Sequence, residues 1–510
     1  MANRDITLRI VEGEIHALLG ENGAGKTTLM NILYGLISKD SGRIIVRGEV
    51  VEPRSPMDMI ARGVGMVHQH FKLIPTLTVT ENVVLGMEPA GSLVRLGGAG
   101  KMLSGLMPMD LRAAAKRIRV IAQENRMLVD PNARVQDIPI GVQQRVEIIK
   151  CLYRSANILI LDEPTSVLTP QEVDDLFVTL ERFRESGKTI ILITHKLREP
   201  MMLADRITVL RDGALVKTVQ KKDTSPAELA RMMVGRPVEF TVEKPPTTPG
   251  PVVLEVTGLG LEVEGRSVLK DINLSVRQGE ILGIAGVEGN GQTELVETVA
   301  GLRRPTRGRV LVAGIDVTGK GVRQVRAAGL CHIPEDRQKR GLVLGFSVEE
   351  NLILGSHRLP STTTGPAHAL LNHAAVRGIS SELVQKFSIR LPTVTALAGT
   401  LSGGNQQKVV VARELSSGPK AVLAAQPTRG LDVGATEQIH RLLIEMRNAG
   451  AGILLVSAEL DEVRSLSDRI AVMFNGRIVA FREPDTSPEE LGLLMAGQSV
   501  DDRTEVESSV

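Results

Sequence analysis

The chain has no tryptophan, and aromatic residues make up only 2% of its 510 positions. Cysteine is equally scarce: Cys151 and Cys331 lie far apart, without the spacing of metal ligands. So few aromatic side chains argue against stacking platforms for single-stranded nucleic acid. Two isolated cysteines argue against a disulfide framework or a zinc site. We expect both thiols to pack as small hydrophobic side chains.

No charge of either sign dominates, and no apolar run is long enough to cross a membrane. The 61 Lys and Arg residues nearly balance the 59 Asp and Glu residues, for a net charge of +2, so we expect no nucleic-acid partner. A transmembrane helix needs roughly 20 apolar residues in a row, and the opening MANRDITLRI lacks the apolar centre of a secretion signal. Any role at a membrane would therefore need a partner.

The strongest local signal is the segment GENGAGKTT at residues 20–28, which fits the phosphate-loop pattern G-x-x-x-x-G-K-[ST]. An apolar run at 15–19 precedes it, and apolar residues at helical spacing follow it. Backbone N–H groups of such a loop bind phosphates at the start of a helix, where Lys26 would reach the β- and γ-phosphates and the Thr27 hydroxyl would hold Mg²⁺. The predicted nucleotide-binding residues are Gly20, Glu21, Asn22, Gly23, Ala24, Gly25, Lys26, Thr27 and Thr28.

The segment that leads into this loop occurs twice. DITLRIVEGEI, starting at Asp5, returns as DINLSVRQGEI at Asp271, a shift of 271 − 5 = 266 residues. We therefore interpret the chain as a tandem duplicate. The copies are separated by a segment with five prolines, which predicts a stiff linker. We divide the chain into a first domain (1–236), a linker (237–251), a second domain (252–498) and an acidic tail (499–510) that we expect to be disordered.

Both copies alternate short apolar runs with helical stretches, a pattern typical of parallel α/β domains. Residues 88–137 differ in character and predict a helical insertion, with LRAAAKRIRVIAQE at its centre. The runs that predict buried strands are ILIL, TIILI and RITVL in the first copy, starting at Ile158, Thr189 and Arg206, and VLAA, GILLV and RIAVM in the second.

Polar residues at two of these strand ends suit phosphate chemistry. Asp162 and Glu163 end the strand ILILD, and His195 follows the strand TIILIT. Asp162 can hold Mg²⁺ through water, Glu163 can orient and polarise an attacking water, and His195 can reach a γ-phosphate. A merely solvated carboxylate pair and a structural histidine are the alternatives.

At residues 401–408 the second copy has LSGGNQQK, which we call the signature segment. Together with the phosphate loop and the Asp-Glu pair, it resembles the ABC ATPase family over nearly the whole chain. That resemblance implies two tandem P-loop NTPase domains, each an α/β domain with a mainly parallel core sheet, a helical subdomain and an antiparallel β edge. It also implies ATP and Mg²⁺ as cofactors, with Glu163, His195 and Gln69 as catalytic residues and Thr27, Gln69 and Asp162 at the metal.

In that family, the signature segment of one domain closes over the nucleotide bound to the other. The resemblance thus implies that Ser402, Gly403, Gly404 and Gln406 contact the γ-phosphate of ATP held by the first copy, and that Gln69 senses this phosphate. The histidines on either side of Gln69, His68 and His70, do not predict a metal site, because no third ligand is evident.

In such a pairing, each of two composite sites combines the phosphate loop of one domain with the signature segment of the other. The departures from the family pattern would all belong to one of these two sites. The second copy has Gln292 at the position of Lys26, Glu335 for Gln69, Ala425 and Gln426 for the Asp-Glu pair, and Ala458 for His195. The first copy has IPIGV for the signature, where Pro139 replaces the serine and removes an N–H donor. Asp432 follows the intact signature, and Thr169 stands at its counterpart. We predict one competent and one hydrolytically dead site.

More narrowly, VHQHFKLIPTLTVTENVVLG, IPEDRQKRGLVL and QPTRGLDVGA are similar to the double ATPase subunit of bacterial monosaccharide and nucleoside importers, leaning to the nucleoside branch. This implies a peripheral protein at the cytoplasmic face of the cell membrane, bound to permease subunits and served indirectly by a solute-binding lipoprotein. Its two domains would pair within one chain, or two chains would dimerise on the permease. The alternatives are a pentose or hexose importer and a soluble tandem ABC protein acting on ribosomes.

The repeat also allows the lengths of the segments that precede Asp5 and Asp271 to be compared. In the second copy, residues 252–270 precede Asp271, whereas only residues 1–4 precede Asp5. The extra segment alternates apolar residues from Val253 to Val263, which predicts an edge strand. Because the first copy lacks it, we expect translation to start upstream of Met1; a functional truncation is the alternative.

Overall fold

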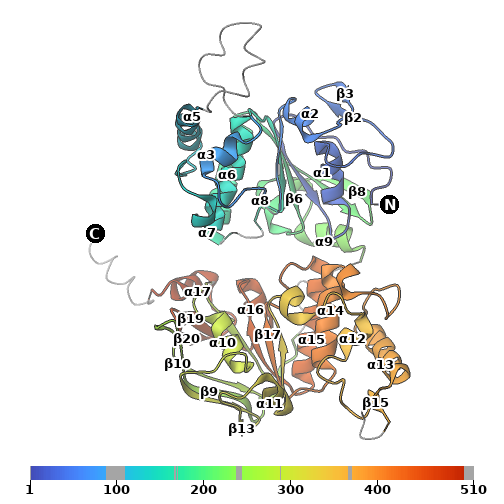
Figure 1. The fold of residues 1–510 in the computed structure, drawn as a ribbon, viewed down its shortest axis with the longest axis vertical. Helices are drawn as coiled ribbons and strands as arrows, with labels where there is room; N and C mark the ends of the chain where they lie inside the picture. The colour runs from blue at the N-terminus through green and yellow to red at the C-terminus, as the bar shows by residue number, and fades with distance from the viewer. Residues whose placement is uncertain are drawn as a thin grey trace, which may run out of the picture. The chain divides into compact units, whose positions relative to one another are not determined.

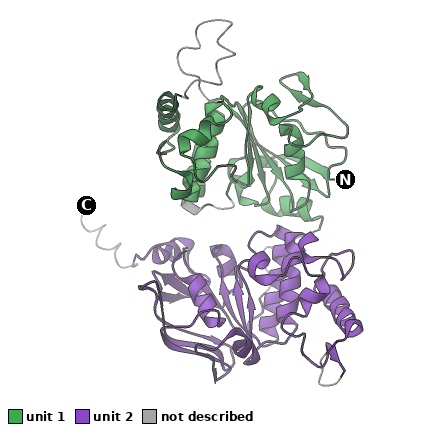
Figure 2. Cartoon of the chain, in the orientation of Figure 1, with its two compact units in different colours: residues 1–238 green, residues 239–510 purple. Residues whose placement is uncertain are grey.

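The computed structural model describes residues 2–69, 71–87, 110–165, 168, 170–236, 244–287, 289–365 and 370–498. The chain forms two compact units, residues 1–238 and 239–510 (Figure 2). The predicted linker starts at the end of the first unit, and its residues 237–243 lie outside the described residues. So do the tail 499–510, most of the insertion's first half (88–109), His70 and Thr169.

The first unit is built on a six-stranded sheet in the order β4-β5-β6-β1-β7-β8. The first five of these strands are parallel, and β8 joins β7 in antiparallel orientation at one edge. Their apolar runs are buried because helices cover both faces, which is the usual environment of a parallel sheet (Figure 1). The strands are β1 (Ile15–Leu19), β4 (Val64–Val67), β5 (Ile158–Asp162), β6 (Thr189–Thr194), β7 (Arg206–Arg211) and β8 (Ala214–Gln220).

The helices of the first unit include the predicted insertion helix: LRAAAKRIRVIAQE forms α5 (Leu111–Glu124), which packs on α6. Thr78 caps α3 with a capping box, since its hydroxyl accepts from the Glu81 N–H while the Glu81 carboxylate accepts from the Thr78 N–H. The other helices are α1 (Lys26–Tyr34), α2 (Pro56–Ile60), α3 (Val79–Val84), α6 (Ile140–Tyr153), α7 (Pro170–Glu185), α8 (Arg198–Leu203) and α9 (Pro226–Val234), with short 3-10 turns at Val135–Asp137 and Lys221–Asp223.

The second unit repeats this sheet in the order β14-β17-β18-β11-β19-β20, again with one antiparallel edge strand. Every strand predicted from an apolar run in either copy is present, which confirms the parallel α/β prediction. The strands are β11 (Ile281–Ala285), β14 (Leu330–Ile333), β17 (Ala421–Ala425), β18 (Gly452–Val456), β19 (Arg469–Phe474) and β20 (Arg477–Arg482). The helices are α10 (Gln292–Val299), α11 (Val322–Ala327), α12 (Val348–Leu352), α13 (His373–Lys386), α14 (Gly403–Leu415), α15 (Val433–Asn448), α16 (Leu460–Leu466) and α17 (Pro488–Met495).

One prediction about this unit was wrong. The segment from Val253 to Val263 lies in β9 (Val252–Val263), but β9 is not an edge strand. It pairs with β10 (Arg266–Arg277) on one side and β12 (Arg307–Val312) on the other, in the four-stranded sheet β10-β9-β12-β13, which ends at β13 (Ile315–Asp316). The apolar side chains of β9 alternate into the core, and that alternation alone does not distinguish an inner strand from an edge strand.

The corresponding part of the first unit is smaller. Among the described residues of this unit, its counterpart is the hairpin of β2 (Ile44–Val46) and β3 (Glu49–Val51), and residues 2–14 form no strand. Ile6, Leu8 and Ile10 instead pack, partly buried, against the core. The upstream start stays a prediction.

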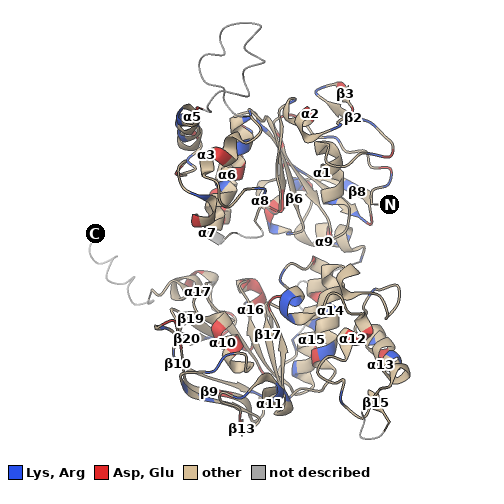
Figure 3. Ribbon diagram, viewed as in Figure 1, with Lys and Arg blue, Asp and Glu red and all other residues tan. Residues whose placement is uncertain are grey.

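Both cysteines are buried free thiols, and Cys151 belongs to the hydrophobic core, as predicted. Figure 3 shows Lys and Arg interspersed with Asp and Glu in both units. Among the described residues, no helix combines the length and the hydrophobicity needed to cross a bilayer.

Candidate nucleotide sites

The predicted phosphate loop connects β1 to α1 in the first unit. Gly23 and Gly25 have φ angles of 85° and 93°, the left-handed conformation that glycine adopts without strain. Lys26 is 5% exposed, and its ammonium donates to the carbonyls of Gly20 (2.7 Å) and Glu21 (2.9 Å). The cation thus lies over the loop at the start of a helix, where N–H groups and charge both favour an anion.

Asp162 lies beside this loop at the carboxyl end of β5. Its side chain is buried, and the exposed Thr27 donates its hydroxyl to Asp162 Oδ1 at 3.4 Å. Burial, reinforced by the charge of Glu163, raises the pKa of Asp162 to about 6. Hydroxyl and carboxylate oxygens are the ligand types that suit Mg²⁺.

Glu163 is the centre of a three-residue cluster. Gln69 Nε2 donates to Glu163 Oε2 at 2.8 Å, and His195 Nδ1 lies 2.8 Å from Glu163 Oε1. Gln69 follows β4, Glu163 follows β5 and His195 follows β6, so the parallel sheet brings the ends of three adjacent strands together. Although burial pulls the pKa of Glu163 upward, the hydrogen bond and charge of His195 together with the charge of Lys26 hold it below its ordinary value. The carboxylate is therefore ionised and available to accept a proton.

Glu163 also has an unusual backbone conformation, with φ of 47°. Its N–H donates to the Ile193 carbonyl at 2.9 Å, which continues the pairing of β5 with β6 by one residue. A left-handed glutamate costs conformational free energy.

The second unit has a similar backbone conformation at the corresponding positions, but its side chains differ. Gly289 and Gly291 again have positive φ angles, and Gln426 has the φ of 47° seen at Glu163. Gln292 Nε2 donates to the Val287 carbonyl at 3.0 Å, and Gln426 Oε1 accepts from the Ala458 N–H at 3.1 Å. No carboxylate stands at 425 or 426, so the pair that could hold a metal and polarise water is absent from these positions.

A pocket of about 240 Å³ borders this second loop, lined by Gln292, Thr293, Glu335 and Gln426 among others. Glu335 forms an ion pair with Arg429, and the Thr293 hydroxyl lies 3.5 Å from Glu335 Oε2. After β4 the first unit has the amide of Gln69. After β14 the second unit has the carboxylate of Glu335, which is ion-paired with Arg429.

The signature segment lies at the start of α14. Ser402 is exposed at the N-cap position, and Gly404 is buried against Ala435. Gln406 is 2% exposed and bonded within its own unit, because its Nε2 donates to the Ala398 carbonyl and its Oε1 accepts from Gln338 Nε2. To touch a nucleotide, the Gln406 side chain would have to leave both partners. In the first unit, Pro139 caps α6 at the corresponding place without a side-chain hydrogen bond.

Two residues near the signature segment were missed at the sequence level, Arg337 and Arg429. They lie in PEDRQKRG and QPTRGLD, next to Glu335, Gln426 and Asp432, and the sequence patterns assign neither arginine a role. A usable signal was present in the repeat: Gln69 pairs with Glu335 at a shift of 266, but Asn82 pairs with Asn351 at 351 − 82 = 269. Three residues are thus added in the second copy at the loop that carries Arg337.

The comparisons with known proteins give the family. The sequence profile of the ABC transporter family matches residues 3–166 and 269–429, which is more than half of the chain. The chain belongs to the ABC transporter family. Each of its two ABC ATPase domains carries one of the loops described above, and domains of this family bind ATP.

Relatives of this ABC protein are import ATP-binding subunits, which are ATPases coupled to transport. The guanosine import ATP-binding protein NupO of Bacillus subtilis is 46% identical, covering 98% of this chain and 95% of the relative. The nucleoside import ATP-binding protein NupA of Lactococcus lactis is 43% identical, covering 98% and 96%. The ribose import ATP-binding protein RbsA 1 of Rubrobacter xylanophilus is 40% identical, covering 96% and 94%.

Among solved structures, one described as RNase-L Inhibitor aligns with 98% of this chain and 95% of its own at a TM-score of 0.63. The sequence identity is 20%, so this likeness shows the tandem fold alone.

Proposed function

We propose that the chain hydrolyses ATP to energise import of a nucleoside or a simple sugar through an ABC transporter. The observation that carries the proposal is the cluster of Gln69, Glu163 and His195 beside an intact phosphate loop. A carboxylate held ionised at the end of a strand, next to a phosphate site, suits transfer of a phosphoryl group to water. The names of the relatives add the link to import.

In this proposal ATP binds at residues 20–28, with the Lys26 ammonium at the β- and γ-phosphates and Mg²⁺ near Thr27, Gln69 and Asp162. The ion would neutralise charge on the phosphates. Glu163 positions the attacking water and accepts its proton, and His195 holds the Glu163 carboxylate in place through the 2.8 Å contact. Gln69, bonded to the other carboxylate oxygen, connects this centre to the loop after β4.

The competent site is proposed to be shared between the domains. Ser402, Gly403 and Gly404 of the second domain would close over the ATP held by the first. The distribution of losses supports this arrangement, because the groups at 292, 335, 425, 426 and 458 and the serine missing at 139 all belong to the other composite site. Independent drift would have scattered such losses over both sites.

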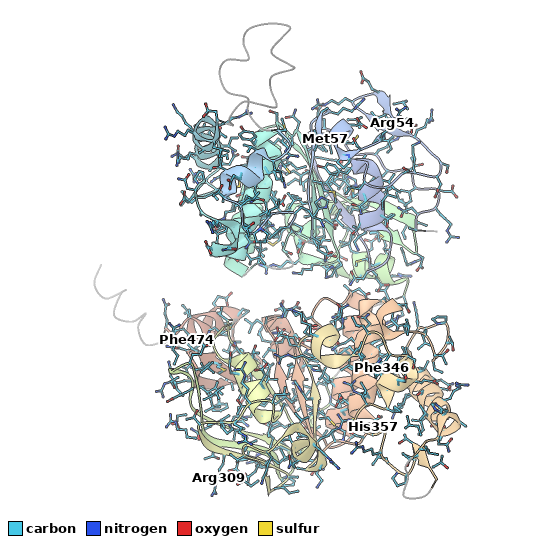
Figure 4. All side chains as sticks on the ribbon, in the orientation of Figure 1. Arg54, Met57, Arg309, Phe346, His357 and Phe474 are labelled. Atoms are coloured by element: carbon cyan, nitrogen blue, oxygen red, sulfur yellow. The ribbon has the colours of Figure 1, made fainter. Side chains whose placement is uncertain are left out.

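The partners are proposed to be permease subunits, with a solute-binding lipoprotein acting through them, which would place the chain at the cytoplasmic face of the membrane. Exposed apolar side chains in the loop after β14 offer a surface for a permease: Val343, Leu344 and Phe346 are each 37–44% exposed, and Phe346 is labelled in Figure 4. On the permease, either the two ATPase domains of one chain pair with each other, or two chains form a dimer. The ribosome-acting alternative rests on fold likeness alone, to structures of a ribosome recycling factor and a ribosome-bound protein at 19% identity.

The solute is proposed from the names of the relatives. Relatives at 46% and 43% identity import guanosine and nucleosides, but a glucose import ATP-binding protein of Haloferax volcanii is 45% identical. We favour a nucleoside, and a pentose or hexose is the alternative.

Uptake in the native host tests the proposal. A strain lacking the gene is complemented with the wild-type chain or with Glu163→Gln, and uptake of radiolabelled guanosine, ribose and glucose is measured. We expect guanosine uptake to depend on the wild-type chain and to be lost with Glu163→Gln. Unchanged uptake of all three solutes in the deletion strain would contradict the role in import.

A further inference from the structure

In the second domain, an arginine lies directly against the signature segment. The loop after β14 turns through a π-helix at Arg337–Gly341, which packs on α14 (Figure 1). Asp336 caps this turn, since its Oδ1 accepts from the N–H groups of Gln338 and Lys339 at 3.0 Å each. The turn therefore has a fixed start and carries Arg337 at its first position.

The guanidinium of Arg337 lies between the signature segment and the loop after β17. Its Nη1 donates to the Arg429 carbonyl at 2.7 Å, and a Cβ built on Gly403 would come within 2.7 Å of its Nη2. Glycine at 403 thus leaves the room that the guanidinium occupies. Arg337 Nε is buried without a hydrogen-bond partner among the described residues, so this placement costs free energy.

The rest of the turn holds the same helix at two more points. Gln338 Nε2 donates to Gln406 Oε1 at 3.0 Å, and the Arg413 guanidinium donates to the Gly341 carbonyl at 2.7 Å. The loop that includes Arg429 also contacts the pocket beside the second phosphate loop, because Arg429 forms an ion pair with Glu335, which lines that pocket. The start of α14 is therefore fixed to the loop between β17 and α15.

The described residues of the first domain show no such arrangement at its eroded signature. Its loop after β4 is three residues shorter, and the residue at the position of Gly403 is Ile140, which is 47% exposed. Within this chain, the arginine accompanies the signature that keeps its serine and glycines and is missing where that signature is lost. A general requirement of the fold would have kept it in both copies.

We propose that Arg337 is a positioning residue for ATP hydrolysis: it fixes Ser402 and Gly403 in the geometry in which they close over the γ-phosphate. This proposal rests on the proposed function, because it takes the signature segment to act on ATP bound by the first domain. Arg337 acts through the signature segment. A misplacement of about 1 Å at such a segment lowers turnover by up to about 10²-fold.

The test compares Arg337→Met with Lys339→Ala in the full-length chain. Methionine keeps much of the stem and removes the guanidinium, while Lys339 lies in the same turn with an 85% exposed side chain and loses the same charge. We expect Arg337→Met to lower kcat for ATP about 10- to 100-fold. Direct binding of ATP by Lys26 and its neighbours should change less than about twofold, and the melting temperature should stay close to that of the wild type. Lys339→Ala should match the wild type.

Two further variants distinguish positioning from folding. Arg337→Lys keeps the charge but loses the planar guanidinium, which reaches both the Arg429 carbonyl and Gly403. It should therefore recover only part of kcat. Gly403→Ala should lower kcat strongly in the wild type, because the methyl group displaces the guanidinium, and much less when Arg337 is already methionine. The proposal would be overturned if Gly403→Ala lowered kcat by the same factor in the wild type and in Arg337→Met. A wild-type kcat for Arg337→Met would also overturn it.

Failure of this inference is separable from failure of the proposed function. If Glu163→Gln stops turnover while Arg337→Met turns over normally, only the role of Arg337 is wrong. If Glu163→Gln still turns over, the proposed catalytic site is itself wrong, whatever Arg337 does.

Discussion

His195 Nδ1 lies 2.8 Å from Glu163 Oε1, and the two residues follow adjacent parallel strands. At the corresponding positions of the second domain, Gln426 Oε1 accepts from the backbone N–H of Ala458. Both Glu163 and Gln426 have a φ of 47°. The fold thus keeps the strained backbone in both copies, and only the first copy pairs it with an ionised carboxylate and an imidazole.

His195→Ala should therefore lower turnover by about 10- to 100-fold, because the Glu163 carboxylate loses the contact that orients it. ATP binding, measured directly, should change little, since the phosphate loop is untouched. Steady-state phosphate release by the full-length chain measures the effect. A turnover within twofold of the wild type would show that the contact is only structural.

Ser402→Arg should abolish turnover without altering the phosphate loop or Glu163. Ser402 is exposed at the start of α14, so a large cation there would block closure over ATP without disturbing the core. A chain that ends at Pro237 should likewise be inactive, because it lacks the signature segment. Hydrolysis by the truncated chain at the full-length rate would contradict a shared site.

Asp162→Asn should stabilise the nucleotide-free protein while it impairs hydrolysis. The pKa of Asp162 is about 6 in the folded chain and near 3.9 when unfolded, so its charge costs up to about 3 kcal/mol at neutral pH. We expect the melting temperature to rise by about 2 to 8 °C. Glu163→Gln is the matched control: its pKa is lowered on folding, so neutralising it should give no such rise.

Much of this site follows from local sequence, because strands, loops and glycine turns are short-range features. The apolar run at 15–19, the loop at 20–28 and the Asp-Glu pair after ILIL all lie where the patterns placed them. Their convergence also follows, since the ends of adjacent parallel strands meet at one edge of the sheet.

What the sequence did not predict depends on contacts between distant segments. Whether β9 is an inner or an edge strand is decided by its pairing with β12, about 50 residues further along the chain. Gln406 Oε1 accepts from Gln338, 68 residues earlier in the chain, and Arg337 lies in a π-helix within a loop that is three residues longer than its counterpart. Periodicity reports which face of an element is buried and does not report its partner.

His332→Met should remove part of the acid sensitivity of the second domain. Burial, with the nearby charge of Arg340, lowers the pKa of His332 to about 4, although Glu297 opposes the shift. Because the unfolded chain takes up this proton near pH 6.5, stability present at neutral pH is lost as the pH falls towards 4, by up to about 3 kcal/mol. Methionine stands at the equivalent position 66 of the first copy, so it is a compatible replacement. Denaturant unfolding at pH 7 and pH 5 should show a smaller difference for the variant, and an equal difference would contradict the assignment.

The central claim is that one site hydrolyses ATP and that its water-polarising group belongs to the first domain. The most direct measurement is steady-state ATP turnover by the full-length chain carrying Glu163→Gln, compared with Gln426→Ala and Gln292→Ala at the matched positions of the second domain. The account predicts a loss of about 10²- to 10⁴-fold for Glu163→Gln and turnover close to the wild type for the other two. Substantial hydrolysis by Glu163→Gln, or a comparable loss in either second-domain variant, would contradict it.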